Sequence, residues 1–162
     1  MLQIGDKVVY PMHGAGIITG VEECDFQGQN ESFFVLKMLL GSMKVMVPVD
    51  RAEAGCLRKV IPASKLSAVE EVLLGKPERL EGTWNKRFLA IQDRMKSGDI
   101  ADVAAVFRNL FLQDRYRKIS SGERRLLDLS RRILVSEIIY ACDNTQEETE
   151  KWLDSVIKEN QG

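Results

Sequence analysis

An aromatic residue followed by two cations is the part of the chain best suited to binding chemistry. It lies in the stretch Thr83-Trp84-Asn85-Lys86-Arg87. Thr83 can serve as a helix N-cap, because its hydroxyl can accept a hydrogen bond from a free backbone N–H of the first turn. Trp84 would then project from the start of a helix beside Lys86 and Arg87. A flat apolar ring in that position can wedge against nucleic-acid bases while the cations hold phosphates.

The same tryptophan also fits an ordinary buried stripe. Trp84, Phe88, Ile91 and Met95 lie at positions i, i+4, i+7 and i+11, which is the spacing of one helix face. Such stripes usually face a hydrophobic core. The spacing alone therefore leaves two alternatives open, a core residue and a functional wedge.

Positive charge is concentrated around this stretch. The chain has 162 residues and a net charge of −1, but residues 84–132 hold 12 Lys or Arg and 6 Asp or Glu, a net charge of +6. The flanking parts are acidic. A near-neutral chain is not expected to bind DNA strongly by itself, whereas a local basic face can contact a few phosphates with salt-sensitive affinity.

Two arginine pairs, Arg124-Arg125 and Arg131-Arg132, are seven residues apart and so share a helix face that we expect to point toward solvent. They can form a solvated cationic surface, or they can contact phosphate or an acidic partner.

The chain offers few residues for catalysis. His13 is the only histidine, beside a glycine at a strand turn, and a structural hydrogen bond is expected for it. Neither a phosphate-binding loop nor a nucleophile elbow occurs. We therefore expect no enzyme activity, no cofactor and no metal.

Residues 1–50 predict short β-strands over 7–10, 17–19, 32–38 and 43–47, with a turn at Gly28 and Asn30. This spacing is typical of a small antiparallel SH3-like or Tudor-like β-barrel. Pro48 cannot donate to a ladder, so the strand before it is expected at a sheet edge. That edge can be guarded by Lys44, or it can be used to pair with a strand of a partner. Residues 51–63 are expected to form a connection.

Helices are predicted for most of the rest of the chain. Ser64 is expected to cap the first, and residues 75–82 read as a polar linker or hinge. Asp99 is expected to cap another helix, and Ser120 with Glu123 and Thr145 with Glu148 have the spacing of capping boxes. The predicted class is α+β, a β-barrel module followed by an all-α helical bundle. The predicted divisions are 1–63 for the β-module, 64–82 for a helix and linker, and 83–162 for the helical domain.

Nothing in the sequence indicates export or membrane insertion. No signal peptide and no apolar run of about 18 residues is present. The three cysteines are far apart in sequence and are expected to be reduced. We expect a cytoplasmic protein and a monomer, while the sequence leaves strand exchange through the β-module open.

The opening residues 4–16, Ile-Gly-Asp-Lys-Val-Val-Tyr-Pro-Met-His-Gly-Ala-Gly, resemble the start of CarD-family bacterial transcription regulators. Later motifs support the resemblance: Val45 to Pro48, Gly55-x-Leu57-Arg58, Trp84-x-x-Arg87, Ser97-Gly98-Asp99 and Ser121-Gly122-Glu123-Arg124-x-Leu126. The opening motif is shared with the polymerase-interacting module of the transcription-repair coupling factor. The later motifs are more specific to CarD.

The resemblance implies a mechanism. The β-module would dock on the β1 lobe of the RNA polymerase β subunit, and the helical domain would lie on promoter DNA at the upstream edge of the bubble. Trp84 would wedge into the minor groove and stabilise the open promoter complex. The implied DNA-binding residues are Trp84, Asn85, Lys86, Arg87, Arg124, Arg125 and Arg131. The implied polymerase-binding residues are Cys24, Phe26, Lys44, Val45, Met46, Val47 and Pro48.

The chain departs from some relatives at these sites. Cys24 and Met46 align with arginines on the polymerase-facing strands, which implies docking by main-chain pairing and apolar contact. Leu89 aligns with a cation, which implies one phosphate contact fewer. The alternative function is a protein-interaction adaptor on polymerase that makes no direct DNA contact.

Overall fold

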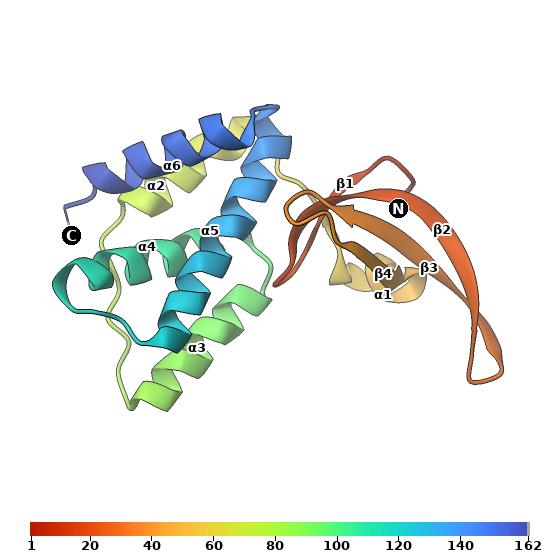
Figure 1. The fold of residues 1–162 in the computed structure, drawn as a ribbon, viewed down its shortest axis with the longest axis horizontal. Helices are drawn as coiled ribbons and strands as arrows, with labels where there is room; N and C mark the ends of the chain where they lie inside the picture. The colour runs from red at the N-terminus through yellow and green to blue at the C-terminus, as the bar shows by residue number, and fades with distance from the viewer. Residues whose placement is uncertain (162) are drawn as a thin grey trace.

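The computed structural model describes residues 1–161, apart from the side chain of Phe26. An antiparallel sheet at the N-terminus is followed by helices, which confirms the predicted α+β class (Figure 1). The strands are β1 (Lys7–Tyr10), β2 (Gly14–Phe26), β3 (Gln29–Met38), β4 (Lys44–Pro48) and β5 (Arg58–Lys59). The helices and helical turns are α1 (Val49–Arg51), η1 (Ala52–Cys56), η2 (Ala63–Lys65), α2 (Leu66–Leu74), α3 (Trp84–Lys96), α4 (Ile100–Tyr116), α5 (Ser121–Cys142) and α6 (Gln146–Glu159).

The five strands form one sheet in the order β4-β3-β2-β1-β5. Its longest part is the β2–β3 hairpin, which extends well beyond the rest of the sheet (Figure 1). Gln27 and Gly28 form its two-residue turn and both have positive φ, which suits the right-handed twist of a hairpin. Asn30, predicted in this turn, lies in β3 instead. The expected edge position of β4 is confirmed.

Two predictions about residues 51–64 were wrong. The expected connection contains a tight helical turn and a fifth strand, in which Arg58 and Lys59 pair with Val9 and Val8 of β1. A two-residue strand has no periodicity of its own, so only its partner reveals it. Ser64 does not cap a helix. Pro62 starts a 3₁₀ turn whose first bond runs from Lys65 N–H to the Pro62 carbonyl, and Ser64 lies inside that turn.

The other helix starts are confirmed. Thr83 accepts from Lys86 N–H and Asp99 from Ala101 N–H, at 3.3 and 2.9 Å. Both predicted capping boxes are complete, one at the start of α5 and one at the start of α6. These signals are local, so the sequence was sufficient to locate them.

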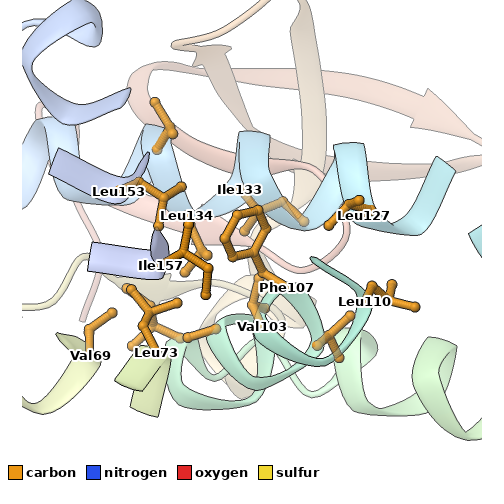
Figure 2. Close-up of a cluster of buried hydrophobic side chains, with 14 of the residues drawn as sticks. Val69, Leu73, Val103, Phe107, Leu110, Leu127, Ile133, Leu134, Leu153 and Ile157 are labelled. Atoms are coloured by element: carbon orange, nitrogen blue, oxygen red, sulfur yellow. The ribbon is translucent and has the colours of Figure 1, made fainter. Parts of the chain in front are cut away.

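The hydrophobic residues form two clusters. The larger lies among α2–α6 and includes Phe107, Leu134 and Leu153, each at most 1% exposed (Figure 2). Val69 and Leu73 of α2 belong to it. The smaller cluster lies in the sheet module and includes Ile18 and Leu36.

Residues 75–82, predicted as a linker or hinge, are tied to the helices through Glu78. Its carboxylate accepts from Arg94 at 3.1 Å and from Arg108 at 2.9 Å, and its backbone N–H donates to Asn109 Oδ1 at 3.0 Å. Burial by itself would raise the pKa of Glu78. The hydrogen bonds and charges of Arg94 and Arg108 outweigh it, so the pKa lies below its ordinary value.

Candidate nucleic-acid interface and docking edge

The start of α3 is held in a fixed conformation by its cap and by Gly82. Thr83 caps the helix, and Arg87 donates from Nη1 to the Gly82 carbonyl at 2.8 Å. Gly82 has a φ of +101°, which favours glycine because a side chain is strained there. Lys86 and Asn85 are exposed, whereas Arg87 is half-buried with its guanidinium directed back at the chain.

The indole of Trp84 lies at the open end of its stripe. Met95 is fully buried, Ile91 and Phe88 are partly buried, and Trp84 is 42% exposed. The stripe is thus core at one end and surface at the other. Trp84 stacks on Phe88, with ring centroids 4.9 Å apart and planes 13° from parallel. A ring supported in this way is pre-oriented, and its exposed part is free for another contact.

Gly122, in the first turn of α5, lies against this aromatic pair. A Cβ at this position would lie 3.1 Å from Phe88 Cε2 and 3.7 Å from Trp84 Cη2. Gly122 was not among the site residues expected from the sequence. Glycine is a poor residue inside a helix, so its presence two residues after the Ser120 cap was the available signal of a close approach. The contact brings the start of α5 beside the start of α3.

The arginines of α5 differ in how much free charge they present. Arg125 is exposed. Arg124 pairs with Asp114 at 2.8 Å. Arg131 makes a two-pronged contact with Asp154 of α6, at 2.7 and 3.2 Å, and its side chain is only 29% exposed. The hydrogen bonds to Asp154 raise the pKa of Arg131 above its ordinary value. Arg131 is therefore held against α6, which differs from the solvent-facing position expected from the spacing.

The edge strand β4 presents a mixture of side chains. Met46 is 38% exposed, Val47 is buried in the sheet cluster, and Val45 and Pro48 are half-buried. Because the Val47 side chain is buried, this residue could take part in docking only through its backbone. Lys44 forms an exposed ion pair with Glu22 at 3.4 Å, which fits its expected role as a guard. Both alternatives for this edge remain, because a guarded strand still has backbone groups along its outer side.

The remaining predicted docking residues lie along the β2–β3 hairpin. Cys24 is half-buried and pairs across the hairpin with Glu31. The predicted contact of Phe26 lies outside the described residues, because its side chain is not described.

Residues 1–161 contain no group of three or more His, Cys, Asp or Glu side chains arranged to hold a metal ion. His13 lies 3.0 Å from the Pro11 carbonyl through Nδ1 and stacks on Tyr10. These contacts fit a structural histidine. No helix in the same range is long and apolar enough to cross a membrane.

Comparison with known proteins covers nearly the whole chain. Residues 2–61 match the family "CarD-like/TRCF RID domain" and residues 68–154 match "CarD, C-terminal domain". The chain belongs to the CarD family. It is 33% identical to the putative transcription factor YdeB of Bacillus subtilis (strain 168) over 139 residues, 85% of this chain and 90% of that protein. This CarD-family chain is therefore a transcription regulator with an N-terminal domain of the type that interacts with RNA polymerase.

Two solved N-terminal domains from Myxococcus xanthus are also similar to this CarD-family chain. CdnLNt is 38% identical, over 38% of this chain and 86% of its own length, with a TM-score of 0.34. The 72-residue N-terminal domain of CarD, solved by NMR, is 30% identical, over 36% of this chain and 79% of its own length, with a TM-score of 0.32.

Proposed function

We propose that the protein stabilises the open promoter complex of bacterial RNA polymerase in the cytoplasm. Its β-module, residues 1–63, docks on the polymerase β subunit through the β4 edge. The helical domain, residues 83–162, then places Trp84 in the minor groove of promoter DNA at the upstream edge of the bubble. No chemical step is involved, since the effect is a shift of the equilibrium between closed and open complexes.

The observation that carries the proposal is the position of Trp84. It is 42% exposed at a capped helix start, while Phe88 and Ile91 of its stripe are partly buried and Met95 is fully buried. The stack on Phe88 holds the indole in one orientation, so little conformational entropy is lost when its free part meets a base step. Exposed Lys86 and Arg125 supply charge for the adjacent phosphates.

Weak DNA affinity is compatible with this mechanism. The net charge is −1, and Arg124 and Arg131 are already paired with carboxylates. Once polymerase holds the β-module, contact with promoter DNA becomes effectively intramolecular, and a small surface is sufficient.

The test is the lifetime of the open complex with Trp84→Ala. Stacking of an aromatic on a base is worth about 1–3 kcal/mol, so the variant should lose most of the stabilisation, roughly tenfold in lifetime, while polymerase still retains it. Leu74→Ala is the matched control, because Leu74 is 40% exposed on α2. Equal lifetimes with Trp84→Ala and the parent would contradict the proposal.

A second candidate is an adaptor that contacts polymerase and another protein without touching DNA. The pairing of Arg124 and Arg131 with carboxylates favours it, since it reduces the charge available to phosphates. A fork-junction DNA separates the two functions. Only the first predicts a Trp84-dependent gain in binding when polymerase is present.

A further inference from the structure

The sheet module and the helical domain are joined by a buried ion pair between Arg58 of β5 and Glu137 of α5. The two Nη atoms of Arg58 donate to the two carboxylate oxygens of Glu137, at 2.6 and 2.7 Å. Glu137 Oε2 also accepts from the backbone N–H of Ile61 at 2.9 Å. The Glu137 side chain is fully buried and that of Arg58 is 30% exposed. A buried carboxylate with three donors is fixed in position, because any movement would leave the charge unpaired.

Arg58 reaches a third element as well. Its Nε donates to the Gly98 carbonyl at 2.7 Å. Gly98 directly follows the C-terminal end of α3, with a φ of +76°, and a Cβ there would lie 2.8 Å from Pro11 Cγ in the β1–β2 turn. Figure 1 shows this end of α3 beside the sheet, while its other end points away. The guanidinium thus connects the sheet, the loop just after α3 and the C-terminal half of α5.

A second contact between α5 and the sheet is made by Ser136, the residue before Glu137. Ser136 Oγ accepts from the backbone N–H of Ala15 at 2.9 Å and donates to the Ile133 carbonyl at 2.8 Å. Gly14 has a φ of +94°, and a Cβ there would lie 2.9 Å from Ser136 Oγ. Ser136 therefore binds the backbone of β2, while its neighbour Glu137 binds the Arg58 side chain of β5 and the backbone N–H of Ile61 just after that strand. Contacts with two different strands restrain rotation as well as separation.

The geometry makes this junction important for Trp84. Trp84 begins α3 and Gly98 follows its end, so the two are separated by about 20 Å of rigid helix at 1.5 Å per residue. A tilt of about 10° at the junction would move the indole by about 3 Å, which is close to the rise of one base along a DNA strand. A ring that must enter one base step tolerates little displacement of that size.

We infer that Arg58 and Glu137 are positioning residues, which hold α3 at a fixed angle to the docking sheet and so set where Trp84 meets DNA. This inference rests on the proposed function. It adds that the pair determines the efficiency of the regulator without touching polymerase or DNA. An unlinked helical domain would present Trp84 over a wide range of positions, and its effective concentration at the bubble edge would fall.

The test uses the full chain with Arg58→Met and Glu137→Met together. The double variant leaves no unpaired buried charge, and replacement of a buried ion pair by apolar residues of similar size is usually tolerated. Arg58→Lys is the second variant, since it keeps the charge but loses the two-pronged geometry. The control is Glu147→Met with Lys151→Met, which removes an exposed pair on α6.

Two measurements are needed for each variant. Residual dipolar couplings report whether the sheet and the helices share one alignment, and open-complex lifetime with purified polymerase reports function. We expect separate alignments for the double variant, a fall in lifetime to the level of Trp84→Ala, and unchanged retention by polymerase. The open-complex lifetime with Arg58→Lys should lie between those of the parent and the double variant, and the control should match the parent in both alignment and lifetime.

Several outcomes would overturn the inference. A single shared alignment in the double variant would show that the pair does not fix the angle. Separate alignments with a parent-like lifetime would show that the angle does not matter, and the proposed function would stand. A parent protein with no effect on the open complex would overturn the proposed function and, with it, the role of the pair.

Discussion

At the scale of single residues, cationic side chains near Trp84 differ in availability. The guanidinium of Arg87 is bound to the Gly82 carbonyl, and Arg124 and Arg131 have carboxylate partners. Lys86 and Arg125 are exposed. Few phosphates would therefore be neutralised, and the dependence of DNA contact on salt should be shallow. A count of arginines in the sequence overestimates this surface, since only the fold identifies their partners.

Glu78 provides a pH-dependent contribution to stability. Its pKa is lower in the folded protein than the ordinary value of 4.5, so its contribution is complete above that value and is lost as pH falls through the folded pKa. In Glu78→Gln the free energy of unfolding should be lower at neutral pH and should depend less on pH in the acid range. Denaturant unfolding between about pH 3 and 7 measures both effects.

The control for this prediction is Glu81→Gln, at an exposed position three residues further along the same segment. In this variant the free energy of unfolding should depend on pH in the acid range as it does in the parent. Parallel curves for Glu78→Gln and the parent would mean that the two arginines do not hold the carboxylate as the structure indicates.

At the scale of elements, the starts of α3 to α6 and the edge position of β4 were predictable, whereas β5 and the turn before α2 were not. Helix starts at Thr83, Asp99 and Ser120 depend on residues within one turn, so the sequence contains the whole signal. Strand β5 exists because β1 lies beside it, and the 3₁₀ turn after Pro62 displaced the expected cap. Where an element depends on a partner far away in sequence, the local sequence pattern is insufficient to predict it.

The capping box of α5 has an effect on the candidate site as well as on the helix. Ser120 accepts from Glu123 N–H at 3.1 Å, and the Glu123 carboxylate accepts from Ser120 N–H at 3.1 Å. Ser120→Ala should lower the free energy of unfolding by about 1 kcal/mol and loosen the turn that supports Trp84. Ser121→Ala, at the exposed next position, is the control for denaturant unfolding. Equal losses from the two changes would argue against a specific cap.

At the scale of the whole molecule, the proposed mechanism needs two surfaces on two modules. Part of the candidate site was predictable: the cap at Thr83, the cations beside Trp84 and the edge strand. The exposure of Trp84 was not, because the spacing of its stripe fits a core residue equally well. The junction at Glu137 was not, although a lone acid within the run Ile133 to Ile139 was a visible anomaly. Nothing local identifies Arg58, nearly 80 positions away in sequence, as its partner.

Docking of the sheet can be tested apart from DNA. Met46 is 38% exposed on β4, so Met46→Glu would bury a charge against a partner and should weaken retention by polymerase by about 1–3 kcal/mol. Leu80→Glu is the matched control, because Leu80 is 37% exposed outside the sheet. Pull-down with the isolated polymerase β1 lobe measures the difference. Retention of both variants at the parent level would exclude the β4 edge as the contact.

The carbonyl of Gly98 at the end of α3 has its hydrogen-bond donor in β5, 40 positions earlier in the chain. The loop that follows the helix carrying Trp84 is thus held by a residue of the sheet module. Loss of the β-module, residues 1–63, would remove the donors that this carbonyl and the Glu137 carboxylate have in Arg58 and Ile61, so the helices could not keep their full stability alone. The two hydrophobic clusters should therefore melt as a single cooperative unit, even though each has its own set of buried side chains.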